Sequence, residues 1–323
     1  MILTASKTNL PLEPVPRQYS RRNLISSDPI IELLEDTDDA TIDFVSGIDR
    51  HNFVQTGSRI GGNEFLIGVA NFISSCREGE AEFRGPSFHQ FLDADLLQIY
   101  EDNQNLYKEE AKYQRRFDLV RDYLPLRGKL LDWGTGDAGF AKFVQDKTKL
   151  RVAGCDVIDW RSEGNKCIPF YRLDPYLSSL SKCRDEEFDT VILMYVLHHI
   201  DPENLEQVLG EVMRVCKRNV IVVEDTFGVE KADTRDLCRL SKRFADLPHS
   251  SQLQIIKMRD YFRNIVVLQV EDMNMPFEFK PIDEWHRVFS KEGLKVADTK
   301  VVGFNSMNSW SNTSFNVVFN LKK

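Results

Sequence analysis

The stretch KLLDWGTGDAGF (residues 129–140) decides the fold class of this 323-residue chain. A short apolar run leads into three glycines, Gly134, Gly136 and Gly139, and a segment of helical character follows them. Glycines at such a turn let the backbone approach a ligand because no Cβ stands in the way. The stretch therefore predicts a strand, a ligand-binding turn and a helix, in that order.

The residues that flank the glycines narrow the class of ligand. A P-loop places Lys and then Ser or Thr directly after its last glycine, whereas Phe140 and Ala141 stand there in this chain. The spacing G-x-G-x-x-G does fit a dinucleotide turn. However, Asp132 stands two residues before the first glycine, and its carboxylate would repel a pyrophosphate. A ligand that carries a positive charge at this point fits better.

Short apolar runs alternate with helix-like segments from residue 129 onward. Strands are predicted at KLLDWG, RVAGCDV, FYRLD, FDTVILMYVL and NVIVVED, with amphipathic helices at AGFAKFVQDKT and PENLEQVLGEVMRVCK. This alternation is typical of a parallel sheet with helices on both faces. A helix at IDEWHRVFSKEG then precedes two strands, LKVADTKVVGF and SFNVVFNLK, joined by a loop. The predicted fold class is α/β: a Rossmann-like, doubly wound, mostly parallel seven-stranded sheet with an antiparallel C-terminal edge.

The remaining segments predict an extension and an insertion. Residues 1–90 are predicted as a helical N-terminal extension or lid, since SSDPIIELLED and NEFLIGVANFISSC have helical apolar spacing. Residues 91–323 are predicted as the main domain, into which residues 91–124 lead as one or two helices. Residues 226–279 form a long insertion whose first half is helical. Ligands bind outside the carboxyl ends of parallel strands, so we expect this insertion to shape a substrate pocket.

Four motifs in this region resemble those of a known family. LLDWGTGDAGF, GCDV, FDTVILMYVLHHIDP and VIVVED are similar, in sequence and in order, to the motif series of class I S-adenosylmethionine-dependent methyltransferases. The resemblance is closest to the small-molecule branch that includes the ubiquinone and menaquinone methyltransferases. It implies S-adenosylmethionine as the cofactor and methyl transfer by in-line displacement. The usual turn of this family has its third glycine where this chain has Ala138.

The residues at the strand ends match the chemical groups of that cofactor. Asp132 can accept hydrogen bonds from its ammonium group, directly or through water. Asp156 can accept from both ribose hydroxyls, as the acidic residue does in dinucleotide folds. Gly134 and Gly136 give the cofactor close access to the backbone.

Further residues are assigned to the same cofactor site. They are Thr135, Val157, Asp174 and Tyr107. Asp174 fits either an acceptor for the adenine amino group or the cap of a helix. Tyr107 lies on the predicted helix before the glycine turn, together with Tyr100 and Tyr113. Such a ring fits either a place over the sulfonium or the core.

The segment YVLHHIDP, after the fourth predicted strand, is expected to face the transferable methyl group. Tyr195, His198 and His199 are therefore candidate catalytic residues, with a histidine as general base. In the branch that the chain resembles, such histidines often only start the next helix and pack under the cofactor. Glu224 ends the fifth strand beside them and is the fourth candidate, for orienting the acceptor or binding a cationic one.

The composition narrows the partners and the location. A net charge of −8 argues against a nucleic-acid acceptor, because phosphate binding requires a basic face. No apolar run reaches the roughly 18 residues of a membrane span, so we expect none and predict a cytoplasmic protein. The six cysteines form no C-x-x-C pair and none lies at metal-ligand spacing from a histidine, so no metal site is predicted.

The predicted function is methyl transfer to a small organic acceptor, with oxygen or nitrogen favoured over carbon. Two alternatives stay open: methylation of a peptide, a protein or RNA, and a cofactor-binding scaffold without catalytic activity. A homodimer is compatible with the sequence, which does not define the oligomeric state.

Overall fold

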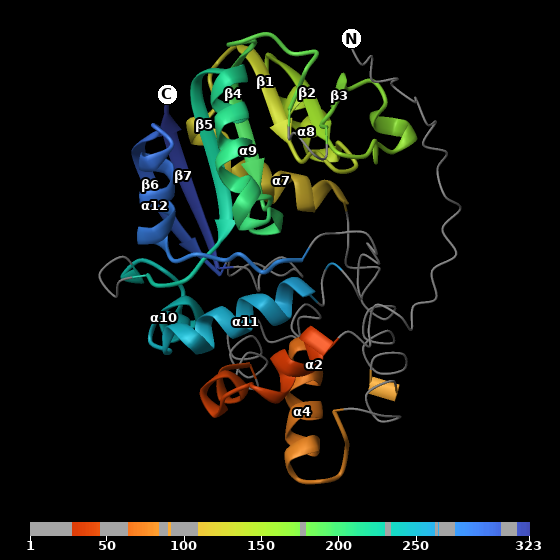
Figure 1. The fold of residues 1–323 in the computed structure, drawn as a ribbon, viewed down its shortest axis with the longest axis vertical. Helices are drawn as coiled ribbons and strands as arrows, with labels where there is room; N and C mark the ends of the chain where they lie inside the picture. The colour runs from red at the N-terminus through yellow and green to blue at the C-terminus, as the bar shows by residue number, and fades with distance from the viewer. Residues whose placement is uncertain are drawn as a thin grey trace, which may run out of the picture.

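The computed structural model describes residues 28–45, 64–83, 90–91, 109–174, 179–229, 234–261, 264, 275–304 and 315–323. Within these residues, seven strands form one sheet, which occupies the upper part of Figure 1. The strands are β1 (Gly128–Trp133), β2 (Leu150–Asp156), β3 (Phe170–Arg172), β4 (Phe188–Met194), β5 (Cys216–Asp225), β6 (Lys295–Gly303) and β7 (Asn316–Lys322). Their order in the sheet is β3-β2-β1-β4-β5-β7-β6.

The strand directions confirm the predicted fold class. Strands β1 to β5 pair in parallel, whereas β7 runs antiparallel to both β5 and β6. Asp132 on β1 lies opposite Gly154 on β2 and Ile192 on β4, so the ends of these three strands meet at one edge. This carboxyl edge is where parallel sheets bind ligands.

Helices cover both faces of the sheet and its carboxyl edge. They are α2 (Asp28–Glu35), α4 (Glu64–Arg77), α7 (Glu109–Val120), α8 (Gly139–Lys147), α9 (Pro202–Val215), α10 (Arg239–Ala245), α11 (His249–Tyr261) and α12 (Ile282–Lys291). Short 3₁₀ turns also occur: η3 (Arg121–Tyr123), η4 (Glu163–Asn165) and η5 (Leu197–His199). The helices predicted at SSDPIIELLED and NEFLIGVANFISSC are confirmed as α2 and α4.

Two apolar layers sandwich the central strands. On one face, Leu131 and Leu193 pack with the buried apolar residues of α9 and with Trp285 and Phe289 of α12. On the other face, Leu130 packs with buried residues of α7 and α8. Since neighbouring positions of one strand enter opposite layers, the central strands contain continuous apolar runs, such as residues 191–194 of β4.

A third apolar core lies at the carboxyl edge of the sheet. It joins Leu34 of α2 and Ile73 of α4 to Phe244 of α10 and Ile255 of α11. Figure 1 shows α11 across the tips of the parallel strands, with α2 and α4 on its far side. Helices from the N-terminal part and from the predicted insertion thus share one core.

Some expectations fall outside the described residues. They are the roles of Tyr100 and Tyr107, the helix predicted between residues 92 and 108, and the loop over residues 305–314. In the part of the chain that the structure describes, no helix has the length and apolar character needed to cross a membrane.

Candidate active site

The glycine turn closes over the end of β2. The backbone N–H groups of Gly134 and Thr135 both donate to the carbonyl of Cys155, at 2.9 and 3.0 Å. Gly134 and Gly136 have φ of 72° and 54°, in the left-handed region that favours glycine. A Cβ on Gly134 would lie 2.6 Å from Val196 Cγ2, whereas no described atom lies within 4 Å of one on Gly136. Gly134 therefore makes room for Val196, while Gly136 presents an open face.

The third glycine of the turn serves packing as well. A Cβ on Gly139 would lie 2.1 Å from the Tyr113 hydroxyl oxygen. That hydroxyl donates to Asp137 Oδ2 at 2.6 Å, and Asp137 Oδ1 accepts from the Gly139 N–H at 3.0 Å. Tyr113 therefore fastens α7 to the turn. Between these residues, Ala138 has φ 57°, a conformation that a Cβ disfavours.

Asp132 is a buried carboxyl at the base of the turn. It is 4% exposed, and Thr135 Oγ1 donates to its Oδ2 at 2.8 Å. Burial raises the pKa of Asp132 to about 7, although the Thr135 hydroxyl and the Arg116 guanidinium oppose the shift. The carboxyl is thus only partly balanced in charge and fits a ligand with an ammonium group. Arg116, on α7, has no sequence motif to reveal it.

Asp156 faces the same turn from the end of β2. Its Oδ2 accepts from the Gly136 N–H at 3.0 Å, and its Oδ1 accepts from the Val157 N–H at 2.8 Å. These bonds orient the carboxylate toward the turn. Val157 and Ile158 directly follow and expose apolar side chains, by 40% and 37%.

Asp174 lies beyond the neighbouring strand β3. Its side chain is half-buried, and its backbone N–H donates to the Ser179 carbonyl at 3.2 Å. Asp156 and Arg172 pair between β2 and β3, so the loop that carries Asp174 starts beside Asp156. The structure therefore brings Asp132, Thr135, Gly136, Asp156 and Val157 together, with Asp174 nearby.

Tyr195 begins the loop after β4 in a strained conformation. Its φ of 59° is unusual for a bulky residue, and such outliers cluster at functional sites. Its hydroxyl donates to Asn316 Oδ1 on β7 at 2.7 Å. The Arg116 guanidinium lies 5.7 Å from the centre of its ring. Arg116 thus reaches both Asp132 and Tyr195.

Glu224, at the end of β5, holds the same loop in place. It is fully buried, and its Oε1 accepts from the N–H groups of Val196 and Leu197 at 3.0 and 2.7 Å. Its Oε2 accepts from His198 Nδ1 at 2.5 Å. Among the described residues, the hydrogen-bond partners of this carboxylate all belong to the loop, so the buried carboxylate orients the loop.

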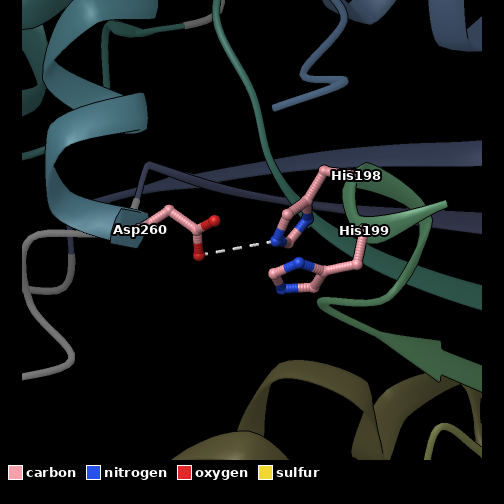
Figure 2. A group of neighbouring side chains, drawn as sticks. All are labelled: His198, His199 and Asp260. Carbon is pink, nitrogen blue, oxygen red and sulfur yellow. Dashed lines mark ion pairs between the residues drawn. The ribbon is translucent and has the colours of Figure 1, made fainter. Parts of the chain in front are cut away.

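His198 lies between two carboxylates. Its Nε2 is 3.6 Å from Asp260 Oδ1 on α11, as Figure 2 shows, and its ring stacks on Phe279 with centroids 4.5 Å apart. Burial by itself would lower the pKa of His198, but Glu224 and Asp260 outweigh it and raise the pKa to about 10. Burial would raise the pKa of Asp260, and His198 instead lowers it to about 2.

His199 lies beside this group. Its ring centre is 4.1 Å from that of His198, and its side chain is half-buried. The structure thus brings His198, His199 and Glu224 together, and Asp260 joins them. Asp260 was not foreseen, because in the sequence it is an ordinary polar residue far along the chain.

A buried ion pair fixes α11 at this place. Arg259 Nη1 donates to Asp225 Oδ2, and the two side chains are 1% and 2% exposed. Asp225 ends β5 directly after Glu224, and Arg259 precedes Asp260. Arg259 therefore pairs with β5 directly, whereas Asp260 lies beside His198, which is bonded to Glu224.

The contact between Gly134 and Val196 joins the two groups of residues. One group, around Asp132 and Asp156, surrounds an open glycine backbone. The other, around His198, lies under α11 at the ends of β4 and β5. The edge of the sheet can thus hold a ligand on one side and a reacting partner on the other.

Comparisons with solved structures find methyltransferases. One is a putative methyltransferase of Haloferax volcanii in complex with its activator Trm112, with 12% identity, TM-score 0.42, and coverage of 70% of this chain and 96% of that one. A second is an S-adenosylmethionine-dependent methyltransferase of Methanosarcina mazei, with 17% identity, TM-score 0.42, and coverage of 63% and 96%. A third is the 1,6-didemethyltoxoflavin-N1-methyltransferase of Burkholderia thailandensis, with 13% identity, TM-score 0.42, and coverage of 74% and 91%. At such identities and scores these likenesses carry no argument about function.

The sequence itself gives the stronger evidence. No curated protein matches the chain. A family model described as a methyltransferase domain matches residues 105–298, which is more than half of the chain. The matched range contains the glycine turn, Asp156 and the loop with His198. The chain belongs to the methyltransferase domain family, and it is a methyltransferase whose cofactor is S-adenosylmethionine.

Proposed function

We propose that this methyltransferase acts on an oxygen or nitrogen atom of a small organic molecule. The observation that carries the proposal is the burial of the polar groups on the acceptor side. His198, beneath α11, is 1% exposed, and Asp260, on α11 itself, is 4% exposed. A folded protein or an RNA duplex has no access to such groups, whereas a small molecule can reach them after a local opening. The net charge of −8 also disfavours RNA.

We propose that the first group of residues binds the cofactor. Asp132 accepts from the ammonium group and Asp156 from the ribose hydroxyls, with Gly136 providing open backbone between them. Thr135 holds the Asp132 carboxylate in position. Arg116 has the charge and the place to pair with the cofactor's carboxylate.

The adenine end is assigned to the residues after β2 and β3. Val157 and Ile158 expose apolar surface that a flat ring would cover, and burying it is favourable by about 25 cal/mol per Å². Asp174 stands near as an acceptor for the amino group. Tyr107 stays a prediction for the sulfonium end, outside the described residues.

The bound cofactor supplies a methyl group on a positively charged sulfur. The chain itself has to align the acceptor with that methyl group and to keep water out, which can account for most of the rate. We propose that Tyr195 lines the path between donor and acceptor. His198, His199 and Asp260 form the polar group that handles the acceptor's proton, and Glu224 is a positioning residue behind them.

We further propose that residues 1–90 and the insertion 226–279 act together as a cap over the acceptor side of the domain formed by residues 91–323. The shared core of α2, α4, α10 and α11 supports this. The resemblance to the ubiquinone and menaquinone branch favours a metabolite acceptor in the cytoplasm. A homodimer stays a prediction that sedimentation of the purified protein checks.

The cofactor site is tested by calorimetry with S-adenosylmethionine and with its demethylated product. Asp156→Ala removes charged hydrogen bonds of about 1.5–3 kcal/mol each, so the affinity should fall at least about tenfold. Asp159→Ala, three residues away on an exposed loop, is the matched control and should bind as the wild type does. Unchanged affinity of the Asp156 variant would show that the assigned ribose site is wrong.

The acceptor class is tested with cofactor that carries a labelled methyl group. The protein is incubated with a cell extract, which is then divided by size. We expect the label among small molecules, and neither protease nor ribonuclease treatment of the extract should reduce it. Label that precipitates with macromolecules and is released by either enzyme would contradict a small acceptor.

A further inference from the structure

Three side chains at the acceptor end have the arrangement of metal ligands. His198, His199 and Asp260 each offer one ligand atom, and these atoms lie within 4.8 Å of one another. Figure 2 shows the two imidazole rings on one loop and the carboxylate on the end of α11, turned toward each other. We infer that they bind one divalent transition-metal ion, with Zn²⁺ as the best match.

The distance between His198 Nε2 and Asp260 Oδ1 supports a shared ion. It is 3.6 Å, beyond the 2.7–3.2 Å typical of N–H···O hydrogen bonds. Two ligands of a tetrahedral zinc ion, bonded at about 2.0–2.1 Å, lie roughly 3.3 Å apart. The two atoms are therefore closer to the spacing of metal ligands than to that of a direct bond.

Two buried atoms of this cluster lack a partner. Among the described residues, neither His198 Nε2 nor Asp260 Oδ2 has a hydrogen bond, and both side chains are more than nine-tenths buried. The other oxygen of Asp260 accepts from Asn264 Nδ2 at 2.8 Å. Buried polar atoms without partners are rare in native proteins, so each requires an explanation. An ion on His198 Nε2 that both oxygens of Asp260 bind would satisfy both atoms.

Glu224 prepares His198 for this role. Because Nδ1 donates to the Glu224 carboxylate, the lone pair of the neutral ring is on Nε2, which faces Asp260. A carboxylate behind a histidine in this way fixes the tautomer and increases the basicity of a metal ligand. Glu224 is itself held by two backbone N–H groups, so the ring cannot easily turn away.

The charges of the cluster also favour a divalent ion. Glu224 and Asp260 bring two acidic side chains to this buried cluster, and the charge of a divalent ion matches that of two carboxylates. The neighbouring pairs Arg259–Asp225 and Lys280–Glu278 are each neutral and do not change this count.

The ligand set selects the class of metal. Magnesium and calcium prefer oxygen ligands, whereas two imidazoles and one carboxylate suit Zn²⁺ and similar ions. Three protein ligands leave one position open, as in catalytic zinc sites. The use of that position rests on the proposed function. An acceptor hydroxyl bound there would lose its proton to water, and its oxygen pair would then form the new bond to carbon while the C–S pair stays on sulfur.

The ion is tested by direct binding to the full-length protein. After treatment with a chelator, the protein is titrated with Zn²⁺ in a calorimeter and with Co²⁺ in a spectrophotometer. We expect one ion per chain and visible Co²⁺ absorption of a site with nitrogen ligands. His199→Ala and Asp260→Asn should each weaken Zn²⁺ binding at least about tenfold, and Glu224→Gln about 10–100-fold although all ligands remain.

A matched control uses a histidine away from the cluster. His286, on α12, shares a hydrogen bond with Thr299, and His286→Ala should bind Zn²⁺ as the wild type does. If Asp260→Asn does not fold, Zn²⁺ binding by His199→Ala is the deciding measurement. His199 is only half-buried, so its replacement should disturb the fold less. The inference is overturned if the folded wild type binds no Zn²⁺, or if all variants bind it equally. Binding of S-adenosylmethionine to the same samples is measured separately by calorimetry. A wrong metal site can therefore be distinguished from a wrong cofactor site.

Discussion

At the scale of single residues, Asp132 carries a carboxyl whose charge the fold only partly balances. Its pKa of about 7 in the free protein lies well above the 3.8 of an ordinary aspartate, because burial disfavours the ionised form. The folded state therefore holds a proton that the unfolded chain has already lost above pH 4. The stability of the free protein should fall as the pH rises from about 4 to about 7.

The same group should make cofactor binding pH-dependent. An ammonium group pairs with the ionised carboxylate, whose fraction increases about fivefold between pH 6 and pH 7 for a pKa of about 7. The affinity for S-adenosylmethionine should increase about as much, as calorimetry at the two pH values would show. Asp132→Asn should bind more weakly and lose this dependence. Asp156→Asn should keep the pH dependence. If Asp156→Asn abolishes the dependence and Asp132→Asn does not, the assignment to Asp132 is wrong.

Ala138 has a backbone conformation that glycine adopts without strain. A left-handed φ costs an alanine about 1–2 kcal/mol. Glycine avoids this strain, but the greater freedom of its unfolded chain lowers stability by about 0.4–1 kcal/mol. Ala138→Gly should therefore increase the free energy of unfolding by about 0.5–1 kcal/mol, measured by urea denaturation. Ala141→Gly, within α8, should instead lower it by a similar amount. A loss of stability in the Ala138 variant would mean that the turn is not strained.

At the scale of elements, the ion pair between Asp225 and Arg259 anchors α11 to β5. Removing one member of a buried pair leaves the other charge without a partner and typically costs 3–5 kcal/mol. Arg259→Leu should therefore lower the free energy of unfolding by about that amount, whereas the double variant Asp225→Leu/Arg259→Leu should lose clearly less. Urea denaturation compares the variants.

An exposed pair is the matched control for this experiment. Arg287 and Asp283 are 72% and 73% exposed on α12. Pairs of this kind contribute at most about 1 kcal/mol, so Arg287→Leu should change stability little. Equal losses for Arg259→Leu and for the double variant would show that the buried pair is not coupled.

Elements differ in how well the sequence predicts them. Strands β1, β2, β4 and β5 contain apolar runs that are buried on both faces, such as VILM of β4, whereas the short β3 has no fully buried residue. The aspartates at the ends of β1, β2 and β5 mark the carboxyl edge of the sheet. Helix α11 was not predicted, because the residues it buries include Gln252, Arg259 and Asp260, which indicate a solvent-exposed helix. Its burial depends on partners in β5 and α2 that are distant in the sequence.

The residues of the candidate site also differ in how well the sequence predicts them. Asp132, Asp156 and Glu224 lie at the carboxyl ends of their strands, and His198 lies in the loop after β4. The order of the motifs is therefore enough to bring them to one edge. Arg116 and Asp260 come from helices without a motif, and only the packing of those helices places them there. The close approach of Val196 to Gly134 could not be predicted either, because the two residues are distant in the sequence and meet only in the fold.

At the scale of the whole molecule, the N-terminal helices and α11 depend on one another. Gln254 of α11 donates to the Leu33 carbonyl at 3.1 Å, and Ser251 donates to Asp38 Oδ2 at 2.5 Å. Leu34 is fully buried in the core that they share. The region that covers the acceptor side is therefore built from segments more distant in sequence than any two neighbouring strands of the parallel part of the sheet.

This dependence can be measured by hydrogen exchange. Leu34→Ala leaves a cavity in the shared core and should lower the stability of that region by about 2–5 kcal/mol. The amides of α11 should then exchange faster, while those of β1 and β4 keep their protection. The control Leu126→Ala changes a residue that is 92% exposed and should leave the exchange rates of α11 and of β1 and β4 unchanged. Equal loss of protection in α11 and β1 would mean that the molecule unfolds as one unit.

The internal position of β7 affects the newly made chain. This strand is synthesised after every other described strand, yet it lies between β5 and β6 and is bonded to both. Until residues 316–322 leave the ribosome, β5 has an open edge on which a second nascent chain can pair. A stop codon at position 316 would delete this interior strand, so we expect alleles that carry one to produce aggregates.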